Sequence, residues 1–182
     1  MGKKVAVLVG SLREGSFNKK LAMQVIKLGA EKFDFQYIEI GNLPLYNEDL
    51  DHENPPKEWE SFRDQINSSE AFLFFTPEYN RSVPGALKNA LDVASRPPGK
   101  GGWAGKPGAV ISVTKGKLGA FGAHHHLRQI LVSLGVETMA KPEAYIGEAE
   151  SLFLEDGSLV EKTKKYMVDL LSKFELWVTK LS

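Results

Sequence analysis

The start of the chain contains the pattern that most restricts the fold: an apolar run, a loop rich in glycine and serine, and an amphipathic helix. The apolar run is Val5–Val9, and it is followed by the segment Gly10–Leu21, GSLREGSFNKKL. Leu21, Val25 and Leu28 then recur at helical spacing. Five consecutive apolar residues are typical of a parallel strand that is covered on both faces. The pattern therefore predicts the opening strand, loop and helix of an α/β fold.

The segment Gly10–Leu21 also has the chemistry of a phosphate site. Backbone N–H groups in such a loop, together with those at the start of the helix, present partial positive charge to an anion. Ser11, Ser16 and Asn18 add short polar side chains, and Arg13 adds a guanidinium suited to phosphate oxygens. The segment predicts a site for one terminal phosphate monoester, and a polar loop without a ligand is the alternative.

Two common nucleotide-binding loops do not fit this segment. Gly10 and Gly15 have the spacing of a Walker A loop, but Ser16-Phe17 stands where lysine and then serine or threonine are required. The segment contains no G-x-G-x-x-G motif, so an ordinary Rossmann dinucleotide loop is not matched either. Nucleoside-triphosphate chemistry is therefore disfavoured.

Composition limits the partners and the location of the protein. The chain has 182 residues, with 23 lysines and arginines and 23 acidic residues, so no net charge attracts nucleic acid or an anionic membrane. It has no cysteine, which excludes disulfides, thiolate metal sites and a thiol nucleophile. No apolar run is long enough for a signal peptide or a membrane span. We expect one cytoplasmic domain over residues 1–182, without nucleic-acid or membrane partners.

Strand and helix patterns alternate along the rest of the chain. Repeated β-α units predict an open, doubly wound, five-stranded parallel sheet with helices on both faces, in three α/β/α layers. After the first strand, the predicted strands are Phe33–Ile40 at a sheet edge, Ala71–Phe75, Ala109–Val113 and Val136–Met139.

Residues with capping side chains predict where two of the helices begin. Ser82 is placed to cap the helix that follows the third strand. Ser158 and Glu161 have the spacing of a capping box for the final helix.

Three polar loops follow predicted strands, and they are expected at one edge of the sheet. They are Gly10–Asn18, Thr76–Ser82 and Thr114–Gly119, which we call the first, second and third loops. In open parallel sheets, ligands bind beyond the carboxyl ends of the strands. The sequence therefore predicts a composite site in which the first loop holds a phosphate and the other two hold a flat polar ring.

The residues of these loops resemble a known family. GSLREGSFNKKLA, TPEYNRSVPGALKNALDVASRP and WAGKP are similar to segments of the NAD(P)H-dependent FMN reductase family, which has the flavodoxin-like fold. The similarity extends over nearly the whole chain, as far as HLRQIL and KPE, and it is strongest to the bacterial quinone, azo-dye and chromate reductases.

The resemblance implies an oxidoreductase with noncovalently bound FMN and with NADPH or NADH as co-substrate. The acceptors implied are quinones or similar compounds, including azo or nitro compounds, flavins and metal oxyanions such as chromate. Family members are usually dimers or tetramers with the flavin near a subunit interface, so a homodimer or homotetramer is implied as well.

The resemblance also implies the residues that bind FMN. The phosphate is assigned to Ser11, Arg13, Ser16, Phe17 and Asn18. The ring is assigned to residues of the second and third loops, which are Pro77, Glu78, Tyr79, Asn80, Thr114, Lys115 and Gly116.

The chain departs from the family pattern at several positions. Arg81 follows PEYN, where relatives often have an aromatic residue, and Val93 stands where tryptophan is common. The third loop carries two lysines, Lys115 and Lys117, where many relatives are less basic. We expect Arg81 and Lys117 at the border of the nicotinamide or acceptor cleft.

No protein side chain is expected to act as a catalytic acid, base or nucleophile, because the flavin itself carries the hydride. No metal site is expected. The run His124–His126 lies on a predicted helix, where consecutive side chains diverge, so it is interpreted as a helix start or an interface. The acidic residues Glu48, Asp49 and Asp51 are interpreted as a solvated loop.

Two other functions are compatible with a flavin-binding α/β domain. A one-electron carrier such as a flavodoxin is usually strongly acidic, for docking to its partners, whereas this chain is neutral. A flavin-binding regulatory protein with little turnover is also compatible, and NAD(P)H consumption with a quinone distinguishes it from a reductase.

Overall fold

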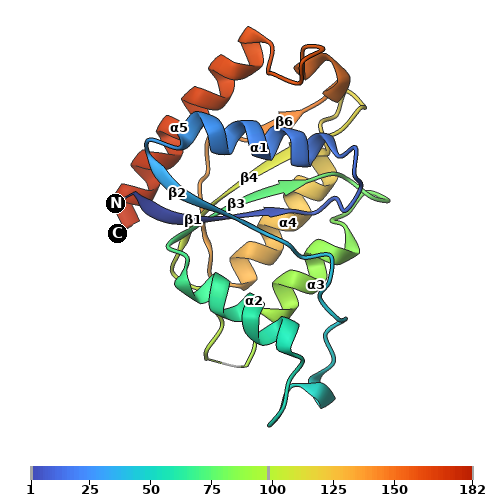
Figure 1. Ribbon diagram of the computed structural model, residues 1–182, viewed down its shortest axis with the longest axis vertical. Helices are drawn as coiled ribbons and strands as arrows, with labels where there is room; N and C mark the ends of the chain where they lie inside the picture. Colours follow the sequence, from blue (N-terminus) through green and yellow to red (C-terminus); the bar gives the residue numbers. More distant parts are fainter. Residues whose placement is uncertain (1, 98, 182) are drawn as a thin grey trace.

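A computed structural model describes residues 2–97 and 99–181 of the chain. Met1, Pro98 and Ser182, which the predicted domain includes, lie outside the described residues. A parallel sheet occupies the centre, with strand order β2-β1-β3-β4-β5 (Figure 1). The strands are β1 Lys3–Val9, β2 Phe33–Ile38, β3 Ala71–Thr76, β4 Pro107–Val113, β5 Glu137–Thr138 and β6 Ala144–Ile146.

Helices cover both faces of the sheet, which confirms the predicted flavodoxin-like architecture in three layers. Helices α1 and α5 pack on one face, and α2, α3 and α4 pack on the other. The helices are α1 Phe17–Gly29, α2 Lys57–Ser68, α3 Gly85–Val93, α4 Phe121–Ser133 and α5 Glu161–Leu181, with 3₁₀ turns at Glu48–Leu50 and Ala149–Leu152. Among the described residues, no helix is both long and apolar enough to span a membrane.

The continuous apolar runs form the central strands, as predicted. Val5 and Val7 of β1 pack toward α1 and α5, whereas Ala6 and Leu8 pack toward α2 and α3. All residues of β3 are buried. Burying one such side chain stabilises a fold by about 1.5–3 kcal/mol, so these strands account for much of the core.

The strand at Phe33–Ile38 lies at the sheet edge, as predicted, although it ends two residues earlier than expected. From Phe33 to Tyr37, buried or half-buried residues alternate with exposed ones, because only one face of an edge strand is fully covered.

The prediction of one last strand at Val136–Met139 is incomplete. β5 covers only Glu137–Thr138, and a further strand, β6 at Ala144–Ile146, pairs in parallel with the same edge of β4. Pro142 lies between the two segments, and proline has no N–H group to donate to a strand ladder. The fifth position of the sheet is therefore filled by two short strands.

Both predicted helix starts are wrong. Helix α3 begins at Gly85, three residues after Ser82. The hydroxyl of Ser158 donates to Asp156, and α5 begins only at Glu161. In both cases a turn precedes the helix, and turns use the same short polar side chains as helix caps.

Candidate functional site

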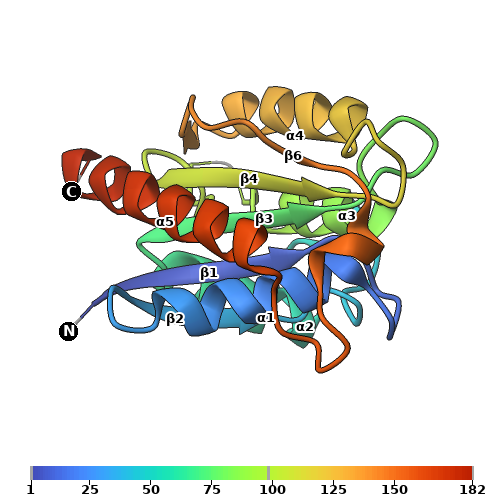
Figure 2. The same cartoon turned by 90° about the horizontal axis from the view of Figure 1, so that it is seen from above.

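The three polar loops lie at the same edge of the sheet, as predicted. They follow β1, β3 and β4, which are adjacent and parallel. In Figure 2 the arrowheads of these strands point to one end of the molecule. Val9 pairs with Phe75, and Phe75 pairs with Ile111, so the strands end at nearly the same level.

The first loop ends in a capped helix N-terminus. The buried Ser16 accepts a hydrogen bond from the N–H of Lys19 at its side-chain oxygen, 3.1 Å away. The first bond along the helix runs from Lys20 N to the carbonyl of Ser16, at 2.9 Å. Phe17 and Asn18 precede that bond, so their N–H groups point out of the helix end and can bind an anion. Arg13 is exposed on the same loop.

Asn18 links the first loop to the third. Its side-chain N–H donates to the carbonyl of Val113, the last residue of β4, at 3.0 Å. The side-chain oxygen of Asn18 is buried and has no partner among the described residues. A buried acceptor without a donor is costly, and a ligand hydroxyl would satisfy it. A sugar-alcohol chain next to a phosphate therefore fits this position.

The side chain of Phe17 packs against other residues. Its ring stacks on Phe153 with centroids 6.2 Å apart. The ammonium groups of Lys20 and Lys115 lie 5.7 and 5.8 Å from its centroid. Lys115 also forms an ion pair with Glu150 at 2.6 Å. Phe17 can therefore contribute its backbone N–H to a phosphate, and Lys115 connects the third loop to the start of α1.

The second loop contains a tight two-residue turn. Tyr79 and Ser82 exchange two backbone hydrogen bonds, each 3.0 Å long. The two central residues, Asn80 and Arg81, have φ angles of 50° and 66°. A two-residue turn of this kind requires positive φ at both central residues, which asparagine tolerates but which costs arginine on the order of 1 kcal/mol.

Glu78 attaches the second loop to the N-terminus of α4. One carboxylate oxygen accepts a hydrogen bond from the N–H of Ala123 at 3.0 Å, and the other lies 3.5 Å from the guanidinium of Arg81. A side chain at Gly122 would lie 2.9 Å from the carbonyl of Arg81, so only glycine allows this approach. The carboxylate of Glu78 thus positions the loop.

The third loop is held by β6. Thr114 donates its N–H to Ile146, and its carbonyl accepts from Ala149, at 3.0 and 3.1 Å. A side chain at Gly147 would lie 2.7 Å from the carbonyl of Lys117. The sequence prediction missed this short strand, and therefore it also missed what positions the third loop.

The other predicted residues lie along these loops. Ser11 is buried and Tyr79 is 43% exposed, whereas Arg81 has a side chain that is 78% exposed. Lys117 is also exposed. The two cations predicted to border the cleft therefore lie on the second and third loops, where a charged substrate can reach them.

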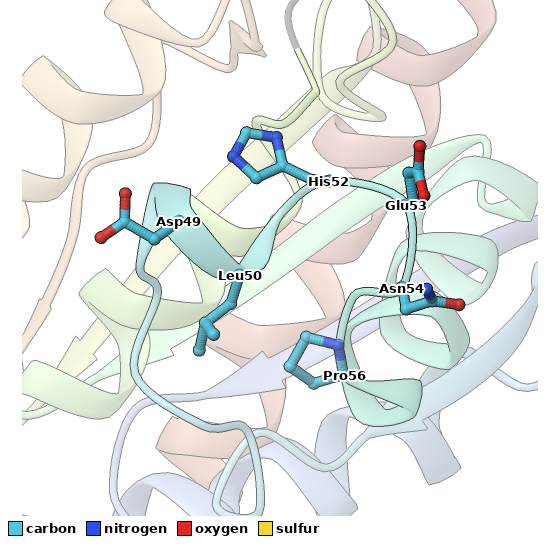
Figure 3. Close-up of a pocket in the computed structure, with 6 residues that line it drawn as sticks. All are labelled: Asp49, Leu50, His52, Glu53, Asn54 and Pro56. Carbon is cyan, nitrogen blue, oxygen red and sulfur yellow. The ribbon is translucent and has the colours of Figure 1, made fainter.

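A separate hollow of about 720 Å³ lies in the loop after β2 and contains none of the predicted site residues. In Figure 3, Leu50 and Pro56 face each other across it, whereas Asp49 points away. Asp49, Leu50, His52, Glu53, Asn54 and Pro56 line the hollow.

The interpretation of Glu48, Asp49 and Asp51 as a solvated cluster is wrong for Asp51. Its carboxylate pairs with Arg63 at 2.7 Å, and the two side chains are 5% and 11% exposed. Hydrogen bonds from Arg63 lower the pKa of Asp51.

Among the described residues, no group of three or more histidines, cysteines or acidic residues is arranged to hold a metal ion.

Comparison with solved structures supports the same fold. FerB from Paracoccus denitrificans, a flavoenzyme NAD(P)H:(acceptor) oxidoreductase, has a TM-score of 0.91 and 44% identity over 98% of both chains. A flavodoxin mutant from Pseudomonas aeruginosa has a TM-score of 0.63 at 21% identity, which supports the fold alone.

Sequence comparisons show the family. The chain is 52% identical over 174 residues to a quinone reductase of Pseudomonas putida, covering 96% of this chain and 94% of the relative. It is 45% identical to a 2-hydroxy-1,4-benzoquinone reductase of a Burkholderia species, covering 98% and 97%. The family model described as NADPH-dependent FMN reductase matches residues 3–151. The chain therefore belongs to the NADPH-dependent FMN reductase family.

Proposed function

We propose that this protein is an NAD(P)H-dependent FMN quinone reductase. The observation that carries the proposal is the composite edge formed by the first, second and third loops at the ends of three adjacent parallel strands. A helix N-terminus, a buried acceptor and a strained turn lie together there. Such a combination suits a ligand with a phosphate, a hydroxylated chain and a flat ring.

The first loop binds the phosphate end of FMN. The N–H groups of Phe17 and Asn18 and the guanidinium of Arg13 neutralise the phosphate charge, and Ser11 adds a hydroxyl. Ser16 acts through the backbone, because its side chain already caps α1. The free oxygen of Asn18 accepts a hydroxyl of the ribityl chain.

The second and third loops hold the ring. Pro77, Tyr79 and Asn80 border it on one side, with Glu78 fixing their backbone. Thr114, Lys115 and Gly116 border it on the other side. When bound, FMN supplies the hydride chemistry. The N–H groups of Tyr79 and Thr114 already bond to Ser82 and Ile146, so other backbone N–H groups of these loops would stabilise negative charge on the bound flavin, as an oxyanion hole does.

Arg81 and Lys117 guide the anionic nicotinamide nucleotide or the acceptor toward the open face of the ring. Quinones are the acceptors best supported by the relatives' names, and the proposal also includes azo compounds, nitro compounds, flavins and chromate as acceptors.

The proposal further includes a cytoplasmic location and assembly into a homodimer or homotetramer. Light scattering of the purified protein tests the assembly.

Absorption spectroscopy tests the proposed function. The protein is incubated with FMN, desalted, and mixed anaerobically with NADPH or NADH. We expect a retained yellow band that bleaches and returns when a quinone is added. Retained flavin that neither nucleotide bleaches would indicate a carrier or regulatory protein. If a direct titration detects no FMN binding, the proposal is wrong.

Substitution of Arg13 by alanine should weaken FMN binding by roughly tenfold to a hundredfold, because it removes a charge-assisted contact to the phosphate. The melting temperature should hardly change, since Arg13 is exposed. A fluorescence titration with FMN measures the effect. Lys27→Ala is the control, because it removes one exposed positive charge from the far end of α1. Equal FMN affinity in both variants would remove Arg13 from the phosphate site.

Substitution of Arg81 by alanine should raise the KM for NAD(P)H or for the quinone by roughly threefold to tenfold, with a smaller change in FMN affinity. Arg81→Gly should do the same and also stabilise the turn, because glycine adopts φ 66° without strain. Steady-state kinetics measures the effect, and Arg81→Lys is the control that retains the charge. Loss of FMN without a change in KM would place Arg81 on the flavin instead.

A further inference from the structure

The three consecutive histidines at the start of α4 contact three different parts of the site. His124 lies against Ser112 of β4, His125 against Tyr145 of β6, and His126 against Ser82 of the second loop. Successive helical residues point in directions about 100° apart, which is why the side chains diverge. The proposed binding site does not include this run.

His124 fixes the end of the third loop through Ser112. Both residues are fully buried. The hydroxyl of Ser112 donates to the carbonyl of Gly119 at 2.6 Å, and Nδ1 of His124 lies 3.2 Å from the same oxygen. A hydroxyl has one proton to donate, so Nδ1 of His124 is the protonated nitrogen and donates to Ser112. The two linked bonds strengthen each other.

His126 fixes the second loop from the same helix. Its Nδ1 lies 3.0 Å from the hydroxyl of Ser82, at the end of the tight turn. One turn earlier on α4, the N–H of Ala123 donates to Glu78, at the beginning of the same loop. The N-terminus of α4 therefore holds the second loop at both ends, around the strained residues Asn80 and Arg81.

His125 attaches α4 to β6, the strand that holds the third loop. The phenol of Tyr145 lies 2.9 Å from Nε2 of His125. Burial, together with a hydrogen bond to the neighbouring carboxylate of Glu143, raises the pKa of Tyr145 to about 12, so the phenol stays protonated. The next residue along β6, Ile146, accepts the N–H of Thr114.

We propose that the run His124–His126 is a positioning element that sets the second and third loops relative to each other around the flavin ring. This inference rests on the proposed FMN site. The three histidines touch the loops or their supports, so they are positioning residues rather than catalytic ones. Hydrogen bonds from one rigid helix fix the position of the strained turn of the second loop relative to the end of the third loop.

Exchange of each histidine for asparagine and for glutamine tests the proposal. The asparagine amide lies near the position of Nδ1, and the glutamine amide lies near that of Nε2. His124 and His126 form their hydrogen bonds through Nδ1, whereas His125 forms its hydrogen bond through Nε2. Asparagine should therefore preserve function at positions 124 and 126, and glutamine should preserve it at position 125.

The measurements are FMN affinity, the midpoint potential of bound FMN, and amide exchange of Tyr79 and Ser82 without FMN. We expect roughly threefold to tenfold weaker binding and a shifted potential in His126→Gln, His124→Gln and His125→Asn. The FMN affinities of His126→Asn, His124→Asn and His125→Gln should remain within about twofold of the parent's. His126 is exposed, so its pair of variants tests the proposal even if a buried His124 variant does not fold.

The outcomes separate this inference from the proposed function. If the parent binds FMN and His126→Gln matches it in affinity, potential and exchange, the positioning role is wrong and the site stands. If asparagine and glutamine have the same effect at all three positions, the role is also wrong. If the parent does not bind FMN but His126→Gln accelerates exchange of Tyr79 and Ser82 while His126→Asn does not, the proposed function fails and the contact to the second loop stands.

Discussion

Alanine at Gly119 should destabilise the fold by about 2–5 kcal/mol and weaken FMN binding as well. Gly119 has φ 61°, where an L-residue is strained by about 1–2 kcal/mol. A side chain there would also lie 2.6 Å from the backbone of Tyr145 and Ile146, which cannot rotate away. The third loop would have to move off β6, and Ser112 would lose the shorter of its two hydrogen bonds to carbonyl groups, leaving the one to Ala144. Urea unfolding and FMN titration measure the two effects.

Alanine substitutions at three other glycines separate the two causes of destabilisation, which are backbone strain at positive φ and steric overlap of the new methyl group. Gly157 has φ 79°, but a methyl group at this position would have no described atom within 4 Å, so Gly157→Ala should cost only about 1–2 kcal/mol. Gly147 has no positive φ, but a methyl group there would lie 2.7 Å from the carbonyl of Lys117, so Gly147→Ala should shift the loop and weaken FMN binding. Gly116 has neither constraint, and alanine there should be nearly neutral for stability. Equal stability of all four variants would show that β6 does not hold the third loop.

The sheet could be predicted from the sequence because its strands are continuous apolar runs. Ala71–Thr76 is buried on both faces, and no helix-period pattern competes with it. The edge strand Phe33–Ile38 shows the alternation expected of one covered face. Because parallel strands end at one edge, the order of the runs also predicts that the three loops meet.

β6 could not be predicted in the same way, because it has three residues and follows a proline. Its position depends on pairing with β4, which is a tertiary contact. In the sequence, Ser112 is one polar residue in an apolar strand, and only the folded structure places it between His124 and Gly119. The divergence of the histidines follows from helix geometry, whereas their partners depend on packing.

The free energy of unfolding should fall steeply in mild acid because of His124. Burial, with smaller effects from Arg128 and His125, lowers the pKa of His124 to about 3. In the unfolded chain its pKa is about 6.5, so between these values the unfolded state binds more protons than the native state. The contribution of neutral His124 to the free energy of unfolding is fully present above pH 6.5, and it is lost as the pH falls toward 3. Between these pH values the free energy of unfolding falls by up to about 1.4 kcal/mol per pH unit. The total loss from this group reaches about 3 kcal/mol at pH 4.

Urea unfolding at pH 7, 5.5 and 4 measures this effect as the difference between the parent and His124→Asn. Asparagine does not titrate, and the acidic residues common to both proteins cancel in the difference. At pH 7 the variant should be the less stable protein, because the native structure has adapted to the imidazole. By pH 4 this disadvantage should have shrunk by about 3 kcal/mol or reversed. His126→Asn retains His124, and it should keep the parent's pH dependence. A difference between parent and His124→Asn that is constant from pH 7 to 4 would mean that the buried imidazole accepts a proton without unfolding. In that case the Ser112–His124 contact could not be as closed to water as the structure describes.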